Sequence, residues 1–332
     1  MRDPATALTG CLLGQALGDA LGFVVEARPR RVAREYVRDY LLAGRAGERA
    51  HPDFPFGQYS DDTQLARELL LSFAETGTWR PEAFARRVAL LFAEGRDVGA
   101  GPGTRSAAMR LLGGTHWSLS GTPAPYAGNG SAMRAAPLGL LFGDDVVLVA
   151  RAAVEQSLVT HLDPRCSAGA VAVAVAASLA ASGGPIGTEE FLETVAGHAA
   201  GADSSLAEAI RRLDEWMGLE PEAAARRLHA ERLDPAYADE WHGISAFVTP
   251  SVMWSLYAFL RTPDDYWTTV CTAVGVGGDT DTMAAIAGAV SGARLGPAAL
   301  PAELVARLND RGEWGWEALS DLARRAARLV GC

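Results

Sequence analysis

The sequence predicts an all-α protein that forms one compact body over residues 1–332. Most apolar runs repeat with the period of a helix and not with the alternation of a half-buried strand. No Asn-Gly or Asp-Gly pair stands between two alternating segments, so no β-hairpin is indicated. Hydrophobic residues make up 49% of the chain and charged residues 21%, a balance that supplies a large core and excludes intrinsic disorder.

Start and stop signals set the boundaries of the predicted helices. Pro81 stands in the first-turn position that proline favours, and Gly95 follows the last residue of the same apolar pattern. The glycine-rich segments 95–103 and 113–130 are predicted to be functional loops between helices. We expect helices at residues 5–22, 61–76, 81–94, 104–112, 131–142, 144–159, 164–182, 188–200, 203–217, 221–231, 248–261, 264–274, 280–294 and 314–330.

The first predicted helix carries a stripe of glycines at residues 10, 14, 18 and 22. A step of four residues keeps these positions on one face, where another backbone can approach closely. Each glycine costs a helix about 1 kcal/mol relative to alanine. Close packing or a ligand must therefore offset this cost, and packing alone is sufficient for most of the stripe.

Two apolar stretches raise the question of a membrane span. Leu8–Val25 carries Asp19 at its centre, where an ionised carboxylate costs on the order of 3 kcal/mol. Residues 166–182 are uncharged but short, and alanine dominates them. We therefore predict two buried helices of a soluble protein that has no membrane partner.

Charge and cysteine usage exclude several functions. The 40 acidic and 30 basic residues give a net charge of −10, which disfavours binding to nucleic acid. Every basic residue is arginine, so Schiff-base chemistry and a P-loop lysine are excluded. The N-terminus shows no secretory signal, and the isolated cysteines suggest reduced thiols, so we expect a cytoplasmic protein. These cysteines are Cys11, Cys166, Cys271 and Cys332.

A first acidic cluster, Ser60, Asp61, Asp62 and Thr63, stands where a helix is predicted to begin. Helix capping alone explains this pattern, because a serine N-cap and acids in the first turn stabilise a helix start. The first cluster therefore predicts a binding site only in combination with another cluster.

The second cluster, Asp279, Thr280, Asp281 and Thr282, follows a diglycine turn at another predicted helix start. Capping explains one of its acids but not both, nor the two hydroxyls. On an ideal helix Asp279 and Asp281 would point about 200° apart, so they converge only where the turn is still non-helical. This behaviour is typical of a ligand-binding loop.

Together the two clusters offer four carboxylates and several hydroxyls, all of them hard oxygen donors. Such a set suits Mg²⁺ or Mn²⁺, and four carboxylates nearly neutralise two divalent cations. Zinc is disfavoured because the six histidines are isolated and no thiolate pair exists, and neither loop has the spacing of an EF-hand. The residues predict a two-metal centre that joins positions near 60 and 280.

Five motifs occur in the order seen in ADP-ribosylglycohydrolases, and they span residues 10 to 292. The chain resembles in particular the bacterial dinitrogenase reductase-activating glycohydrolase branch, which removes ADP-ribose from arginine. The acidic pair followed at long range by GGDTDT is quite specific, whereas the glycine helix alone is a weak signal. The motifs are GCLLGQALGDALGFVVE (10–26), YSDDTQLA (59–66), GNGSAMRAAPLGL (128–140), THLDPRC (160–166) and GVGGDTDTMAAIAGAVSG (275–292).

The resemblance implies a single orthogonal multi-helix bundle with two Mg²⁺ or Mn²⁺ ions at the base of a cleft. Ser60 stands where many members of the family have threonine, and it keeps the hydroxyl. By matching motifs, the metal positions of the family fall on Ser60, Asp61, Asp62, Asp279, Asp281 and Thr282.

The resemblance also implies the catalytic carboxylates. Glu26 falls on the active-site glutamate of the family. An ordinary surface acid would be unfavourable at this position, because the C-terminus of a helix carries partial negative charge. Asp97, in the loop Asp97-Val98-Gly99, falls on an aspartate that the arginine branch keeps beside the scissile bond. Without the resemblance, Asp97 is equally well explained as a helix cap or a solvated loop acid. Asp97 is our first candidate for the acid/base step, and Glu26 holds the ribose or shares that role.

For ADP-ribose itself, a predicted helix after Ser131 would present backbone N–H groups to the diphosphate, with Arg134 as a further donor. Turn formation and capping explain the same residues. The resemblance implies that His161 contacts the phosphates or ribose and that Phe247 stacks on adenine. From the residues alone, either could be an ordinary core residue. The predicted ADP-ribose contacts are Gly99, Asn129, Gly130, Ser131, Met133, His161 and Phe247.

The sequence therefore predicts a cytoplasmic, monomeric hydrolase that cleaves the N-glycosidic bond between ADP-ribose and protein arginine, with free ADP-ribose as product. One alternative is a hydrolase of serine-linked ADP-ribose or of a small ADP-ribose derivative. A second alternative is a catalytically silent ADP-ribose-binding protein. The intact set of acids argues against a silent protein, and the presence of Asp97 favours arginine.

Overall fold

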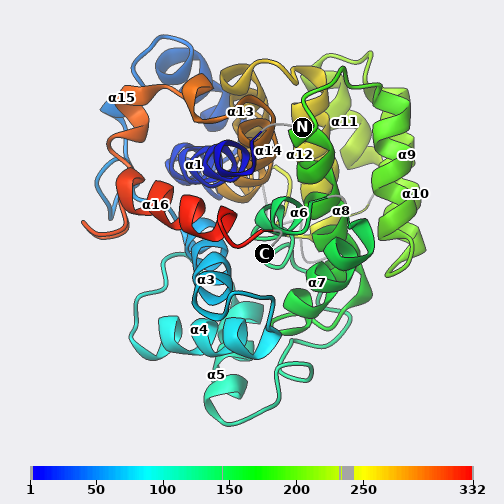
Figure 1. Ribbon diagram of the computed structural model, residues 1–332. Helices are drawn as coiled ribbons and strands as arrows, with labels where there is room; N and C mark the ends of the chain where they lie inside the picture. The colour runs from blue at the N-terminus through cyan, green and yellow to red at the C-terminus, as the bar shows by residue number, and fades with distance from the viewer. Residues whose placement is uncertain (1–2, 144, 232, 234–242, 331–332) are drawn as a thin grey trace.

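The computed structural model describes residues 3–143, 145–231, 233 and 243–330 (Figure 1). These residues form helices joined by loops, and the described part of the chain contains isolated β-bridges but no strand. The α-helices are α1 (Pro4–Phe23), α2 (Arg30–Tyr36), α3 (Asp61–Thr76), α4 (Pro81–Ala93), α5 (Pro102–Leu112), α6 (Ala136–Leu141), α7 (Val146–Leu158), α8 (Pro164–Ala181), α9 (Thr188–Ala199), α10 (Ser204–Arg211), α11 (Pro221–Ala230), α12 (Val248–Arg261), α13 (Tyr266–Val274), α14 (Thr280–Leu295), α15 (Ala302–Val305) and α16 (Trp316–Ala327).

Helices α1 and α14 form the centre of the fold, and Figure 1 shows them side by side with α3, α13 and α16 around them. The glycine stripe of α1 lies directly against the backbone of α14: a Cβ on Gly14 would collide with the carbonyl oxygen of Gly288, and one on Gly18 with that of Ala284. The stripe is thus a packing device, and it brings the C-terminal end of α1 to the start of α14.

Helix α8 is the one described helix that is long and apolar enough to cross a membrane by length and composition. Its apolar window is 78% buried within the protein, and it contacts α6, α7, α9, α12 and α14. Helix α8 therefore has the packing of a core helix.

Several predicted helices differ from the structure in their bounds, and some helical segments are not predicted. The helix predicted from residue 131 begins at Ala136, because the Asn129 carbonyl accepts the N–H groups of Ala132 and Met133 in a turn. The helix predicted over 203–217 changes to a 3₁₀ segment at residues 212–216. Helix α2 and the π-helical turn at residues 37–41 are not predicted, because the segment is rich in charge and buries only Ala33, Tyr36 and Leu41.

A buried ion-pair network joins α3 to the chain near the C-terminus. The guanidinium of Arg67 is fully buried and pairs with Glu68 at 2.9 Å and with Asp310 at 2.7 Å. Asp310 also accepts hydrogen bonds from Gln64, and the carbonyl-type oxygen of Gln64 accepts the Val98 N–H at 3.0 Å. The network therefore fixes the loop that includes residues 96–99 to the first turns of α3.

Removing Asp310 is expected to destabilise the fold strongly. Asp310→Ala leaves the Arg67 guanidinium buried with one carboxylate fewer, and breaking a buried pair costs about 3 kcal/mol. Urea unfolding should show this loss, whereas Asp39→Ala, which removes the exposed pair with Arg38, should change the free energy of unfolding by less than about 1 kcal/mol. Equal effects of the two substitutions would contradict the assignment.

Candidate functional site

A cleft of about 310 Å³ opens where the N-terminal ends of α3 and α14 meet. The loop at residues 99–102 forms one wall, and the loop at residues 126–130 forms another. The predicted residues that line it are Glu26, Asp61, Asp62, Gly99, Asn129, Gly130, Met133, His161, Asp279, Asp281 and Thr282. The fold thus brings most of the predicted site to one place.

The first acidic cluster begins α3 as predicted. Ser60 is the N-cap residue, and its hydroxyl donates to Asp62 Oδ2 at 2.9 Å while it accepts from the Asp62 N–H at 3.3 Å. The Asp61 N–H donates to the carbonyl of Val98 at 2.7 Å, which ties the cluster to the opposite loop. Ser60 lies behind the two aspartates and is fully buried.

The second cluster depends on the diglycine turn. Gly277 and Gly278 have φ angles of 75° and 86°, which favour glycine, and a side chain on Gly278 would meet the backbone of Ile244. The Asp279 N–H donates to the Ile244 carbonyl at 2.8 Å. Asp279 is the N-cap of α14 and lies outside the helical conformation, so it converges with Asp281 as the sequence predicts.

The carboxylates of both clusters form two groups that share Asp281. In each group, one oxygen per residue lies within 4.8 Å of the others. The first group is Asp19, Asp62 and Asp281, and the second is Glu26, Asp279 and Asp281. Residues from distant parts of the sequence, near positions 20, 60 and 280, therefore converge on a volume that one or two cations could occupy.

Two observations indicate that these residues fit a divalent cation. Asp62 Oδ1 and Asp281 Oδ1 are buried and accept no hydrogen bond within the described residues. Burial, together with the charge of neighbouring carboxylates, holds the pKa values of Asp61, Asp62 and Asp281 well above the usual range of an aspartate. A buried acceptor without a donor is costly, and a cation bound among these oxygens would remove that cost.

Asp19 also belongs to the site. From the sequence it is not predicted as a site residue, and its charge only disfavours a membrane span. It is fully buried, and burial raises the pKa of its carboxyl to about 6. The sequence feature that could have identified Asp19 as a site residue is that it is the one charged residue of α1. Its partners lie in α3, so no local pattern identifies them.

Glu26 lies three residues after the end of α1 and lines the cleft beside the second cluster. The next residue, Ala27, has a φ of 56°, and its N–H donates to the Gly278 carbonyl at 2.8 Å. This left-handed turn brings Glu26 to the diglycine loop. Burial, then the charges of Asp279 and Asp19, raise the pKa of Glu26 to about 8.

Asp97 is not among the residues that line the cleft. Its carboxylate pairs with Arg105 at 2.7 Å, and its side chain is only 8% exposed. Gly99, two residues further on, does line the cleft and has a φ of 81°. The loop therefore reaches the site through its glycine backbone, while the Asp97 side chain is directed to α5.

The predicted diphosphate donors differ in the structure. The Arg134 side chain is fully buried and donates to Gly130, Gln156 and Thr160, so it is not available to a ligand. No helix begins at Ser131, and its hydroxyl donates to the Cys166 carbonyl. The backbone N–H groups of Gly130 and Ser131, however, donate no hydrogen bond to the described part of the chain.

The aromatic residues of the cleft also differ from the prediction. Phe247 does not line the cleft; it is 6% exposed, and the Arg165 guanidinium lies 5.0 Å above its ring. Tyr126, which the sequence analysis did not select, does line the cleft and stacks on His161 with ring centroids 6.0 Å apart. Burial and then the charge of Arg134 lower the pKa of His161 to about 3, so its ring is neutral.

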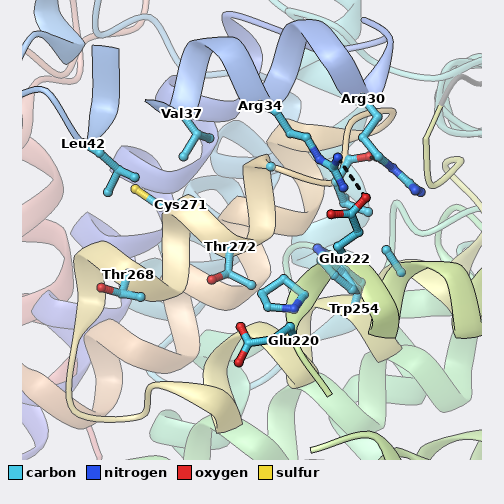
Figure 2. A pocket seen from close by; sticks show the side chains of 14 residues that line it. Arg30, Arg34, Val37, Leu42, Glu220, Glu222, Trp254, Thr268, Cys271 and Thr272 are labelled. Carbon is cyan, nitrogen blue, oxygen red and sulfur yellow. Dashed lines mark hydrogen bonds and ion pairs between the residues drawn. The ribbon is translucent and has the colours of Figure 1, made fainter. Parts of the chain in front are cut away.

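A larger cavity, of about 520 Å³, lies between α2, α11 and α13 (Figure 2). Figure 2 shows Arg34 facing Glu222, with which it pairs at 3.3 Å, and Arg30 donates to the Val276 carbonyl at 3.0 Å. Arg30, Arg34 and Glu222 are therefore directed to one another or to the backbone. The smaller cleft, with its converging carboxylates, is the better candidate for chemistry.

The fold and the cleft define an α-helical protein with a cluster of buried carboxylates at the base of a ligand-sized cavity. The chain belongs to the ADP-ribosylglycohydrolase family, whose profile matches residues 2–331. The protein is therefore a hydrolase that acts on ADP-ribosyl groups, and the fold predicted from the family resemblance is confirmed.

Several relatives match along most of their length. The chain is 34% identical over 323 residues to an uncharacterized protein of Archaeoglobus fulgidus, covering 96% of this chain and 95% of that protein. It is 28% identical over 319 residues to human ADP-ribosylhydrolase ARH3, covering 88% and 86%. It is 26% identical over 307 residues to the ADP-ribosyl-(dinitrogen reductase) glycohydrolase of Rhodospirillum rubrum, covering 90% and 89%.

A solved structure, an ADP-ribosylglycohydrolase-related protein complex, superposes with a TM-score of 0.71 at 25% identity. The match covers 99% of this chain and 100% of that chain. The helical arrangement is thus the one found in this family.

Divalent cations are expected to stabilise the protein. A ligand that binds only the folded state at 100 times its dissociation constant contributes about 2.7 kcal/mol, which corresponds to a rise in Tm of roughly 5 °C. Mn²⁺ or Mg²⁺ should produce such a rise in a thermal unfolding scan. Asp281→Ala should remove most of it, and an equal rise in that variant would place the cation elsewhere.

Proposed function

We propose that the protein is a Mg²⁺- or Mn²⁺-dependent hydrolase that removes ADP-ribose from modified arginine side chains of proteins. The observation that carries this proposal is the set of acids at the cleft: five carboxylates line it, and a sixth, Asp19, lies behind them. Once bound cations displace the protons that burial favours, these six negative charges exceed the charge of two divalent cations. A net negative charge beside the scissile bond favours an acceptor group that is positively charged. The guanidinium of arginine carries such a charge, whereas the hydroxyl of serine does not. The six are Asp19, Glu26, Asp61, Asp62, Asp279 and Asp281.

One loop motif and the name of one relative support the same acceptor. The loop Asp97-Val98-Gly99 resembles that of the arginine branch, and the Rhodospirillum rubrum relative is by name a glycohydrolase of ADP-ribosylated dinitrogen reductase. Free ADP-ribose is the proposed product, because hydrolysis of the N-glycosidic bond returns an unmodified arginine.

In this proposal the substrate lies along the cleft with its ribose at the carboxylate end. The free N–H groups of Gly130 and Ser131 bind the diphosphate, which needs donors in a protein without lysine. Tyr126 and His161 offer an aromatic surface beside this loop. Asp62 and Asp281 direct unpaired oxygens toward the cation positions. Mg²⁺ or Mn²⁺, when bound, supplies positive charge that orients ribose hydroxyls and water.

Glu26 is the better placed of the two predicted catalytic carboxylates. It lines the cleft, and one of its carboxylate oxygens lies within 4.8 Å of oxygens of Asp279 and Asp281, beside the proposed cation positions. As the guanidine departs, positive charge develops on the ribose, and a carboxylate at this position can stabilise that charge or accept a proton from water. Asp97 would have to leave Arg105 before it could take part.

Substitution of these two residues separates their roles. Glu26→Gln keeps the size of the side chain and removes its charge, so kcat should fall by at least about 10²-fold. Asp97→Asn should change kcat by less than about tenfold, because the carboxylate contacts Arg105 and not the cleft. Steady-state release of ADP-ribose measures both values. The reverse order of effects would return the acid/base role to Asp97.

A second candidate is hydrolysis of serine-linked ADP-ribose. The observation that favours it is the orientation of Asp97, since the carboxylate that typifies the arginine branch is not presented to the cleft. A neutral acceptor would require protonation of its leaving oxygen, and Glu26 is a carboxyl group that lines the cleft and could supply that proton.

The test uses two peptides of the same sequence, one ADP-ribosylated on arginine and one on serine, with Mn²⁺ and with a chelator. We expect metal-dependent release of ADP-ribose from the arginine peptide at least tenfold faster than from the serine peptide. The opposite preference would support the second candidate. Binding of ADP-ribose by calorimetry without turnover of either peptide would indicate a silent binding protein.

A further inference from the structure

Asp19 connects the C-terminal part of α1 to the start of α3. Its side chain is fully buried, and each of its oxygens accepts hydrogen bonds from the other helix. Oδ1 accepts the Ser60 N–H at 2.9 Å. Oδ2 accepts both the Thr63 N–H at 3.0 Å and the Thr63 hydroxyl at 2.6 Å. Asp19 therefore binds the α3 backbone on both sides of Asp61 and Asp62.

These contacts add to the local cap, in which the Ser60 hydroxyl accepts the Asp62 N–H. The first N–H groups of a helix lack partners within the helix, and the positive end of the helix dipole favours an anion there. At α3 a carboxylate from another helix takes the Thr63 N–H, which occupies the third helical position. The Ser60 hydroxyl, which accepts the Asp62 N–H, also donates to the Asp62 carboxylate.

On its other side Asp19 faces the cation site. One of its oxygens lies within 4.8 Å of oxygens of Asp62 and Asp281. Those two residues each keep a buried oxygen without a hydrogen bond, whereas both oxygens of Asp19 are occupied by donors. This difference separates the residues that can hold a cation from the residue that stands behind them.

The position of Asp19 is itself set by close helix packing. Its neighbour Gly18 lies against the backbone of Ala284 in α14, the helix that carries Asp281. Asp19 thus lies at the junction of the three helices α1, α3 and α14, and through its hydrogen bonds it determines how the Asp61-Asp62 turn faces Asp281.

We infer that Asp19 is a positioning residue of the cation centre: it holds the start of α3 so that Asp62 and Asp281 share a cation. The inference rests on the metal dependence in the proposed function. Residues that orient metal ligands from behind typically contribute 10- to 100-fold to metal affinity. Asp19 contributes its negative charge in addition to the three hydrogen bonds.

The test measures Mn²⁺ binding directly, by electron paramagnetic resonance of the free ion, without substrate. Asp19→Asn keeps the shape of the side chain but loses charge and one acceptor oxygen, and its Mn²⁺ dissociation constant should rise by 10- to 100-fold. Circular dichroism establishes that the variant is folded. A variant that is only less stable would bind Mn²⁺ normally at a temperature where it is folded.

A matched pair at Thr63 keeps the inference testable if Asp19→Asn does not fold. Thr63→Val removes the hydroxyl that donates to Asp19, and the dissociation constant for Mn²⁺ should rise several-fold. Thr63→Ser keeps the hydroxyl and should restore wild-type binding, which a purely steric role would not require.

The outcomes are distinct for the two proposals. Folded Asp19→Asn with wild-type affinity for Mn²⁺, or equal affinities in the two Thr63 variants, would overturn the positioning role alone. A wild-type protein that binds no Mn²⁺ would overturn the metal dependence of the proposed function and this inference with it.

Discussion

Asp281→Ala is expected to lower kcat/KM for an arginine-linked ADP-ribosyl peptide by at least about 10³-fold. Asp281 belongs to both groups of converging carboxylates, so its loss affects every cation position that the cleft offers. Its Oδ1 is buried and accepts no hydrogen bond within the described residues, so this oxygen is available to a cation. Loss of a preorganised charge at a reacting centre accounts for an effect of this size.

The control for this substitution is Asp321→Ala, which removes a carboxylate that is 58% exposed on α16. It should leave kcat/KM unchanged within about twofold, and circular dichroism of both variants should match that of the wild type. If Asp281→Ala retained kcat/KM within tenfold of wild type, the acidic clusters would not form the catalytic centre.

Gly18→Val is expected to have the largest effect on stability, a loss of at least about 4 kcal/mol in the free energy of unfolding. A side chain at this position would collide with the carbonyl oxygen and carbon of Ala284, which are backbone atoms of a buried helix. Neither α1 nor α14 can move away, because other helices surround both. Guanidinium unfolding of the purified variant, or its failure to accumulate as folded protein, provides the measurement.

Gly197→Ala in α9 is the matched control, because a Cβ there meets no atom within 4 Å. It should stabilise the protein by up to about 1 kcal/mol, since alanine favours a helix more than glycine does. A Gly18→Val variant as stable as the wild type would show that α1 and α14 do not pack as closely as described.

The predicted helices match the structure wherever an apolar face and a boundary residue coincide. The start of α3 at Asp61 and the whole of α12 have the predicted bounds, because a serine cap or a long apolar pattern determines them locally. The two acidic clusters could be predicted for a related reason: each is a short motif at a helix start. Their convergence in space follows from the α1–α14 packing, which the glycine stripe indicates.

The remaining differences come from contacts between distant segments. Arg134 is predicted as a phosphate donor, but Gln156 and Thr160 of another segment accept its hydrogen bonds. Phe247 is directed under Arg165, and Asp19 acquires its role only when α3 packs against α1. Patterns of sequence spacing carry no information about such partners, so burial and pairing decide these residues only in the folded protein.

Anomalous diffraction at the manganese absorption edge, from crystals grown with Mn²⁺, tests the central claim most directly. We expect strong peaks within coordination distance of the carboxylates of Asp62 and Asp281, with Asp19 hydrogen-bonded to Ser60 and Thr63 behind them. Absence of a peak in the cleft at saturating Mn²⁺, or peaks confined to surface acids, would contradict it.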